Sequence, residues 1–463
     1  MILAIVAVWT YSHADQGGFA LASRIDAFVR TEMVKDHIPG LSVAVVKGGK
    51  SVFERGYGSA NIELSAPATA DSVYELQSVT KQFTATAIML LVADGKIKLD
   101  RPVSEYLPDL PSAWSGITIR HLLTHTSGVA DYTEAPGWGA SIRQDRTPEE
   151  LLMPVKKMPL LFVPGSQWRY SNSNYYLLGQ VIERLSGRTW ADFLAARIFR
   201  PLGMTASRAN ELTVIVPKRA SGYHWSKGGL INVPPISPSQ KWAAGGVISS
   251  VKDLIIWDGA LSSGKLLSRD SLAMMLTPAK LTTGTDAPYG FGNELEQDHG
   301  HRVAGHQGSG LGFNTTFLRF VDDKVTVIVL DNVTQGRSRQ IARTIASFLI
   351  PGLSDSGNSG IVDDDPPLTA RLKLILVEAG AGKADPSNFA LSATQQLIPI
   401  IKRSGQQMLG TLGTLKSLTL LESTAKPTGS TRRYRAVYDS KALIWTFQLD
   451  QNGHVIDMEP QME

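Results

Sequence analysis

The chain has 463 residues and contains no cysteine, which excludes disulfides, thiolate nucleophiles and zinc–thiolate sites. Its formal net charge of +4 is mild and comes without a basic block, so the sequence gives nucleic-acid binding no support. With 43% apolar residues the chain is globular rather than disordered, and its length favours two domains over a single core.

The N-terminus carries an apolar run, Ile2 to Trp9, followed by Ser12-His13-Ala14. Small residues at this spacing are typical of a signal-peptide cleavage site, here after Ala14, although the usual basic residues are missing. Either the reading frame begins further upstream or the export signal is weak. No other run approaches the ~20 apolar residues of a membrane span. We therefore expect residues 1–14 to be a signal peptide and the protein to be periplasmic or secreted, without a transmembrane span.

A β-hairpin is expected near the start of the mature chain. The short apolar-rich segments Leu41–Val46 and Ser51–Arg55 are joined by Lys47-Gly48-Gly49-Lys50, a typical hairpin turn. Two further strands are expected at Phe317–Phe320 and Val325–Leu330, on either side of an Asp-Asp-Lys turn. Together these segments predict one antiparallel sheet.

The motif Ser78-Val79-Thr80-Lys81 begins an apolar run that ends at Asp94-Gly95, which predicts a helix with a glycine stop. Residues three apart share one face of a helix, and a serine at its start lies in the positive field of the helix dipole. The lysine amine could relieve the serine of its proton while the first backbone N–H groups stabilise an oxyanion. This arrangement is what acyl transfer needs.

The same four-residue pattern occurs elsewhere, so alone it is a weak signal. It is found at Ser249/Lys252, Ser262/Lys265 and Ser423/Lys426. The surrounding residues predict a helix cap at Ser250, a turn at Ser263-Gly264 and a loop from Ser423 to Thr428. Ser78 could itself be a plain helix cap.

Two further motifs occur once each in the chain. Tyr170-Ser171-Asn172 follows a Pro-Gly loop and precedes a helical run from Tyr176 to Leu185. His306-Gln307-Gly308 lies in a glycine-rich segment, and such glycine density suits backbone that runs close to a ligand. Tyr170 alone could be an ordinary core aromatic, but three motifs in matching surroundings argue for a site.

The order Ser-x-x-Lys, Tyr-x-Asn, His-x-Gly resembles the serine β-lactamase and penicillin-binding superfamily. It most resembles the class C-related branch of esterases, D-aminopeptidases and D-Ala-D-Ala carboxypeptidase-like enzymes. Residues 38–46, 119–128 and 243–247 also resemble stretches of that family. The resemblance covers residues 20–350 and implies an α/β (α+β) catalytic domain. Its antiparallel sheet would be flanked by helices and joined to a helical lobe, with the active site between sheet and lobe.

The resemblance implies three catalytic residues. Ser78 would be the nucleophile that forms an acyl-enzyme, and Lys81 its neighbouring base. Tyr170 would be a second base, acting as a phenolate or as a proton relay. Because a phenol normally titrates near pH ~10, the phenolate would need cations such as Lys81 to favour it.

The resemblance also implies the residues that contact substrate. Asn172 would orient the substrate amide, and the N–H groups of Ser78 and of Ser309, next to Gly308, would form the oxyanion hole. His306 stands where many relatives carry lysine, so the site loses a permanent positive charge near a substrate carboxylate. No metal and no cofactor is expected: His121 and His125 lie four apart but no further ligand accompanies them.

After Pro351 the composition changes to a Ser, Gly and Asp-rich stretch that ends in Pro366-Pro367, which predicts a linker at 351–367. Residues 368–463 predict a small α+β domain with helices at 370–379 and 393–402. A strand meander is expected to follow at 412–421, 432–438, 443–449 and 454–458. The domain loosely resembles modules appended to bacterial serine hydrolases. Substrate gating, wall binding and dimerisation all remain open, as does the oligomeric state.

The sequence is compatible with three functions. The first is a serine hydrolase acting on small-molecule, peptide or ester substrates, among which D-amino-acid and peptidoglycan-derived peptides are options. The second is a class C-like β-lactamase or a β-lactam-binding protein. The third is a non-catalytic cell-wall-binding protein, against which the complete set of motifs argues. His306 argues against a dedicated β-lactamase, because a neutral imidazole holds a carboxylate less firmly than an ammonium.

Overall fold

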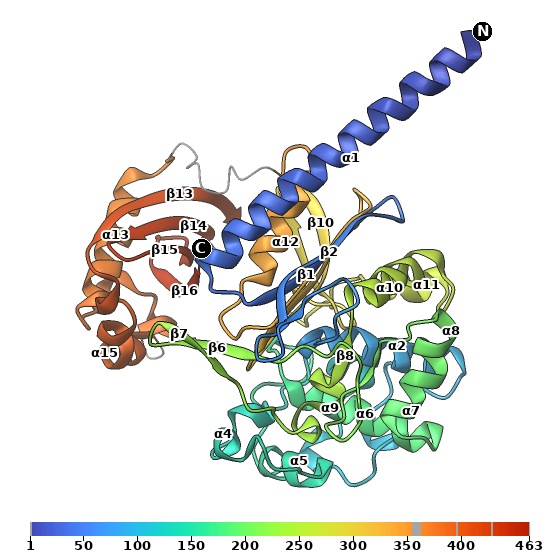
Figure 1. Cartoon of the computed structure of the whole chain (residues 1–463). Helices are drawn as coiled ribbons and strands as arrows, with labels where there is room; N and C mark the ends of the chain where they lie inside the picture. Colours follow the sequence, from blue (N-terminus) through green and yellow to red (C-terminus); the bar gives the residue numbers. More distant parts are fainter. Residues whose placement is uncertain (1, 354–362, 395–396, 427–428, 463) are drawn as a thin grey trace. The chain divides into compact units, whose positions relative to one another are not determined.

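A computed structural model describes residues 2–353, 363–394, 397–426 and 429–462 (Figure 1). The chain divides into two compact units, Met1–Gly352 and Leu353–Glu463. Most of the predicted linker, residues 354–362, lies outside the described residues.

A seven-stranded antiparallel sheet forms the frame of the first unit, in the order β3-β2-β1-β12-β11-β10-β9. Its strands are β1 Gly40–Lys47, β2 Lys50–Asn61, β3 Ala66–Pro67, β9 Glu294–Asp298, β10 His301–Gly310, β11 Phe313–Phe320 and β12 Val325–Asp331. The predicted hairpin is confirmed, and Gly48 and Gly49 take the positive φ angles that its tight turn requires. Strand β12 pairs with both β1 and β11, so all four predicted strands share this sheet.

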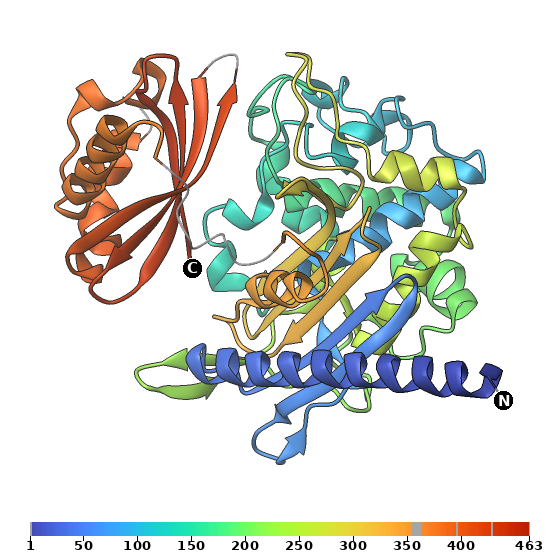
Figure 2. The ribbon, with the colours of Figure 1, turned by 90° about the horizontal axis from the view of Figure 1, so that it is seen from above.

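Helices cover both faces of the sheet, as Figures 1 and 2 show. Helix α12 (Ser338–Ser347) packs on β11 and β12 from one side, where α1 (Ile2–Lys35) contacts α12 and β2. Helix α10 (Val251–Ser263) packs on β1 and β12 from the other side. Every residue of β12 is buried, as expected for a strand covered on both faces.

Residues 2–14, the expected signal peptide, belong to α1, and residue 1 lies outside the described residues. Among the described helices, none combines the length and the apolar character that a bilayer crossing demands.

The helical lobe is built around three helices that contact one another: α2 (Thr80–Ala93), α6 (Asn172–Ser186) and α9 (Pro238–Gly245). The remaining helices of the first unit are α3 Ile119–Leu123, α4 Trp138–Ser141, α5 Pro148–Lys156, α7 Trp190–Leu194, α8 Arg200–Leu202 and α11 Arg269–Met275. Short strands complete it: β4 Tyr74–Glu75, β8 Val247–Ser249 and β5 Arg208–Ala209 form one sheet, and β6 Tyr223–Ser226 and β7 Gly229–Asn232 form a hairpin. The predicted helix after the serine motif is confirmed as α2, with its turn at Asp94-Gly95.

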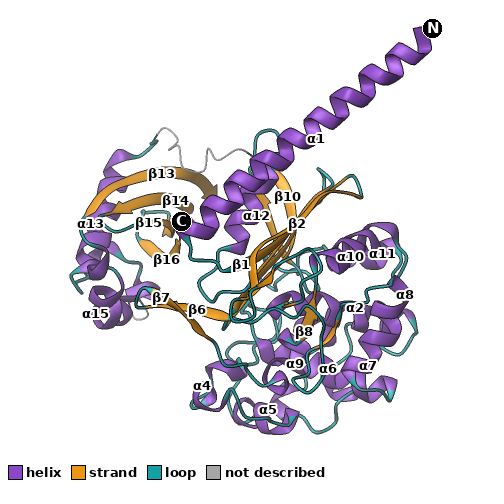
Figure 3. Cartoon of the chain, in the orientation of Figure 1, coloured by secondary structure: helices purple, strands orange, loops and turns teal. Residues whose placement is uncertain are grey.

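The second unit is a four-stranded antiparallel meander with helices on one face (Figure 3). Its elements are α13 Pro366–Gly380, α14 Leu391–Thr394, α15 Leu397–Met408, β13 Leu415–Lys426, β14 Gly429–Tyr438, β15 Ala442–Asp450 and β16 Val455–Met462. Two predictions were wrong in detail. Pro366 and Pro367 belong to the first turn of α13 rather than to a linker, because that turn needs no N–H donor there. Ser423 to Lys426 continue strand β13 instead of forming a loop, and residues 427–428 lie outside the described residues.

Candidate active site

Ser78 lies in a tight turn, Gln77–Val79, that connects β4 to α2. Gln77 is buried with φ +51°, in the left-handed region, so the chain bends sharply just before the serine. Strand β10 passes directly beside this turn: a Cβ on Gly308 would lie 2.2 Å from the carbonyl oxygen of Leu76. The glycine at 308 therefore permits β10 to approach the nucleophile turn.

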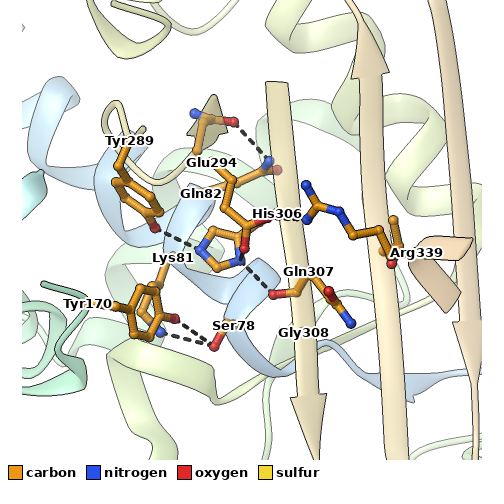
Figure 4. A network of polar contacts seen from close by, with 12 residues as sticks. Ser78, Lys81, Gln82, Tyr170, Tyr289, Glu294, His306, Gln307, Gly308 and Arg339 are labelled. Carbon is orange, nitrogen blue, oxygen red and sulfur yellow. Dashed lines mark hydrogen bonds and ion pairs between the residues drawn. The ribbon is translucent and has the colours of Figure 1, made fainter. Parts of the chain in front are cut away.

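Lys81 points its amine at Ser78 from the first turn of α2 (Figure 4). The Nζ–Oγ distance is 3.1 Å, and Nζ also donates to Asn172 Oδ1 at 2.9 Å and to the carbonyl oxygen of Ala244 at 2.7 Å. Three acceptors match the three N–H groups of an ammonium. Loss of one proton leaves a lone pair within reach of the Ser78 hydroxyl.

Burial lowers the pKa of Lys81 to about 7, because the fully buried side chain cannot hydrate its charged form. The negative charges of Asp131 and Glu294 oppose this shift but do not outweigh it. At neutral pH a substantial fraction of Lys81 is therefore the free amine that a general base must be.

Tyr170 completes the group around the serine, and its hydroxyl donates to Ser78 Oγ at 2.9 Å. Burial raises the pKa of Tyr170 well above 10, although the hydrogen bond to Ser78 acts in the opposite direction. Burial thus favours the relay over the phenolate, since it raises the pKa of Tyr170 and lowers that of Lys81, so the phenol keeps its proton while the amine can lose one.

Asn172 is held by Asp131, which sequence reasoning missed. Asp131 Oδ2 accepts from both the backbone N–H and the side-chain Nδ2 of Asn172, each at 2.9 Å. Because Nδ2 must face the carboxylate, Oδ1 is left to face Lys81. Asp131 is 6% exposed and follows the stretch 119–128, but nothing in its sequence context marked it as part of the site.

His306 is buried behind Tyr170 and is neutral. Its Nδ1 lies 2.6 Å from the carbonyl oxygen of Gln307, so Nδ1 carries the proton, and Nε2 accepts from the Tyr289 hydroxyl at 2.7 Å. Burial lowers the pKa of His306 to about 4, although Glu294, 3.5 Å from Nδ1, acts to raise it. The structure therefore agrees with the sequence interpretation that position 306 supplies no fixed positive charge.

A row of charges lies behind His306, where β9 runs beside α12. Arg339 pairs with Glu294 and, at 3.0 Å, with Glu296. Arg343 pairs with Glu296 and with Asp298, each at 3.1 Å. Glu294 is thus tied to a guanidinium, which limits its effect on the reacting groups.

Ser309 lies on β10 opposite Asn314 of β11, and its hydroxyl donates to Asn314 Oδ1 at 2.8 Å. Asn314 is itself fixed by the carbonyl oxygens of Val333 and Thr334, each 2.8 Å from its Nδ2. Ser309 is exposed, and it follows the buried Gly308, which lies against the nucleophile turn. The oxyanion-hole role of its N–H remains a prediction.

The structure brings Ser78, Lys81, Tyr170, Asn172 and His306 together from three separate parts of the chain. The competing Ser-x-x-Lys pairs lie elsewhere: Ser250 caps α10 and Gly264 ends it, as predicted. Tyr289 and Glu294 were missed, and their only sequence signal was the short glycine-rich stretch around 290–292.

A family comparison identifies the fold. The model of the family described as Beta-lactamase matches residues 25–349. The chain belongs to the Beta-lactamase family. The resemblance predicted from the three motifs is confirmed, and with it the enzyme class, a β-lactamase-related serine hydrolase.

Two curated relatives come from bacteria. The chain is 32% identical over 313 residues to penicillin-binding protein 4* of Bacillus subtilis (strain 168), covering 63% of this chain and 67% of the relative. It is 29% identical over 351 residues to a D-aminopeptidase of Brucella anthropi, covering 74% of this chain and 65% of the relative. The matched stretch thus spans about two thirds of the length of these relatives.

Solved structures extend the comparison. An octameric penicillin-binding protein homologue from Pyrococcus abyssi matches with a TM-score of 0.64 and 25% identity, covering 95% of this chain and 98% of its own. A D-amino acid amidase from Ochrobactrum anthropi SV3 matches with a TM-score of 0.59 and 28% identity, covering 68% of this chain and 90% of its own. The penicillin-binding protein homologue therefore corresponds to both units of this chain.

The first testable consequence concerns the pH dependence of acylation. The second-order rate of labelling by a neutral acylating probe should rise through pH about 7 and then level off, because only the free amine of Lys81 accepts the serine proton. His306, with its pKa near 4, should add no step between pH 5 and 9. Rates measured from pH 5 to 9.5 check this, with His306→Gln as control. A midpoint that disappears in His306→Gln would assign the titration to the histidine instead.

A second consequence concerns stability. Between pH about 7 and 10.5 the unfolded chain protonates Lys81 and the folded chain does not, so the free energy of unfolding should rise with pH relative to Lys81→Met. Below pH 7 both states hold the proton, and the difference between the two proteins should stay constant. At about 1.4 kcal/mol per pKa unit, the difference should change by roughly 2–3 kcal/mol between pH 7 and pH 9. Denaturant titrations of both proteins measure it, and a difference that stays flat over this range would contradict the lowered pKa.

Proposed function

We propose that this protein forms an acyl-enzyme on Ser78 and hydrolyses amide or ester bonds whose acyl part is a D-amino acid. The observation that carries the proposal is the position of Ser78 Oγ, 3.1 Å from the amine of Lys81 and 2.9 Å from the hydroxyl of Tyr170. A nucleophile flanked by a free amine and a proton-bearing phenol has both groups that acyl transfer requires.

The reaction follows from the protonation states. Ser78 passes its proton to neutral Lys81 as Oγ bonds to the substrate carbonyl carbon, and the N–H groups of Ser78 and Ser309 receive the negative oxygen. The leaving amine or alkoxide takes a proton from Tyr170, which regains one from Lys81. A water molecule then gives a proton back to this pair as it attacks the acyl-enzyme, and Ser78 leaves with its proton restored.

The substrate class rests on the relatives and on His306. The relatives include proteins named D-aminopeptidase and D-amino acid amidase. A neutral His306 provides no ammonium for the carboxylate that β-lactams present, and its neighbour Glu294 is negative. These features favour substrates that are neutral or cationic at that end over β-lactams.

Export and a peptidoglycan-derived substrate belong to the same proposal. D-amino acids are the acyl groups that such peptides would offer, and the apolar run before Ala14 supports a periplasmic or secreted protein.

A covalent label tests the nucleophile. Incubation with a fluorophosphonate or a penicillin should add the mass of the probe to one peptide, the one that contains Ser78, and intact-protein and peptide mass spectrometry measure it. Ser78→Ala should lose the adduct and on the order of 10³-fold or more of any hydrolytic rate. Ser249→Ala is a matched control, because Ser249 belongs to a competing motif and its hydroxyl is hydrogen-bonded to that of Ser207 in the core. Labelling at Ser249 or Ser262 would overturn the assignment.

A substrate panel tests the specificity. Against nitrocefin, p-nitrophenyl esters, D- and L-aminoacyl amides and D-Ala-D-Ala peptides, we expect ester and D-aminoacyl turnover to exceed β-lactam hydrolysis. His306→Lys should shift kcat/KM roughly tenfold toward substrates that carry a carboxylate, since one good charged hydrogen bond is worth about that much. His301→Lys, at the other end of the same strand, is the control. Efficient nitrocefin hydrolysis by the unmodified protein, with esters and peptides untouched, would show that the substrate class is wrong.

A further inference from the structure

His125 is a fully buried histidine that the proposed reaction does not use. It follows α3 in a turn with φ +59°, in the left-handed region. Its ring lies behind the site, with centroids 4.4 Å from Tyr170, 4.6 Å from Tyr289 and 5.2 Å from Tyr175. It is therefore packed against the candidate relay and against the tyrosine that bonds to His306.

His125 holds the backbone on both sides of Tyr170. Its carbonyl oxygen accepts the N–H of Arg169 at 3.0 Å, and its ring Nδ1 accepts the N–H of Ser171 at 3.2 Å. Together with the ring contact, one residue thus fixes the chain before Tyr170, the chain after it and one face of its side chain.

The tautomer of His125 follows from its neighbours. Asn174 Oδ1 accepts from Ser127 at 2.6 Å, so Asn174 turns its Nδ2 toward His125 Nδ1, 3.1 Å away. With two N–H donors facing it, Nδ1 must be unprotonated, and the single proton of the neutral ring lies on Nε2.

The other ring nitrogen of His125, Nε2, does not hold the backbone in this way. Among the described residues Nε2 is buried without a hydrogen-bond partner, in a ring that packs against three tyrosine rings. A buried N–H without an acceptor is unfavourable, and a phenylalanine would fill the same space without one. Packing therefore does not account for a histidine here, whereas the acceptor at Nδ1 does.

We propose that His125 is a positioning residue that sets the Tyr170 hydroxyl at hydrogen-bonding distance from Ser78, through the acceptor Nδ1. The proposal rests on the proposed function, in which Tyr170 relays a proton. Displacement of a reacting group by about 1 Å can lower a rate on the order of 10²-fold, so a residue that fixes Tyr170 from three sides should control the rate of acylation rather than substrate affinity.

Two substitutions separate the acceptor from the ring. His125→Phe keeps an aromatic ring but removes Nδ1. His125→Asn places Oδ1 at the same distance along the side chain as Nδ1, and asparagine tolerates the left-handed backbone, but the ring is lost. His121→Phe is the matched control, because His121 Nδ1 likewise accepts a backbone N–H, that of Thr118 at 3.3 Å, and its ring makes no contact with Tyr170 among the described residues.

The measurement is the saturating first-order rate of Ser78 acylation and the probe concentration that gives half of it, together with the melting temperature. His125→Phe should acylate roughly 10- to 100-fold more slowly with a half-saturating concentration within about twofold of the wild type. His125→Asn should acylate faster than His125→Phe, because the asparagine keeps an acceptor. The asparagine variant should nevertheless melt at a lower temperature than the phenylalanine variant, because loss of the ring leaves a cavity. His121→Phe should lower the melting temperature by a few degrees at most and keep the wild-type rate.

The outcomes are distinct. If His125→Phe acylates at the wild-type rate, or if both His125 variants slow in proportion to their loss of stability, His125 has no positioning role. An increase confined to the half-saturating concentration would also overturn the proposal. Failure of the wild-type protein to label at Ser78 would instead overturn the proposed function.

Discussion

The active site depends on a lysine amine kept out of water. Lys81 is enclosed by the three mutually packed helices of the helical lobe, and its contacts there are an amide oxygen of Asn172 and the carbonyl oxygen of Ala244. Burying a cation is unfavourable unless it is neutralised or paired, so the pKa falls to about 7. The fold therefore gives up stability at neutral pH in order to hold a free base beside Ser78.

The carboxylates of Asp131 and Glu294 do not pair directly with the Lys81 amine within the part of the chain that the structure describes. Among the described residues, the hydrogen bonds of Asp131 lead to Lys81 through the amide of Asn172, and Glu294 lies beside His306 and pairs with Arg339. A carboxylate in direct contact would stabilise the ammonium and restore a high pKa. The Asn172 amide orients the amine while leaving it able to lose its proton.

Much of this arrangement was predictable from local sequence. The glycine pair of the β1–β2 turn and the helix after Ser78 each have a local physical signature and were predicted correctly. The three motifs, recognised by their order, lie together in the structure. Residues such as Asp131, His125 and Tyr289 were not found, because their roles arise from contacts between distant segments. The Pro366-Pro367 pair was misread because proline both ends linkers and begins helices.

The electrostatics of the site allow one base and not two. Asp131 and Glu294 raise the pKa of Lys81 toward its ordinary value, and the same two carboxylates add to the effect of burial in raising the pKa of Tyr170. Each negative charge that helps the amine hold a proton also makes a phenolate less stable. Lys81 can therefore become neutral at a pH at which Tyr170 remains a phenol. A phenol that keeps its proton cannot act as a base, so Tyr170 can take part only by passing on its own proton while it receives another. The hydrogen bond from Tyr170 to Ser78 is consistent with this order of protonation, because a relay has to begin with its proton in place.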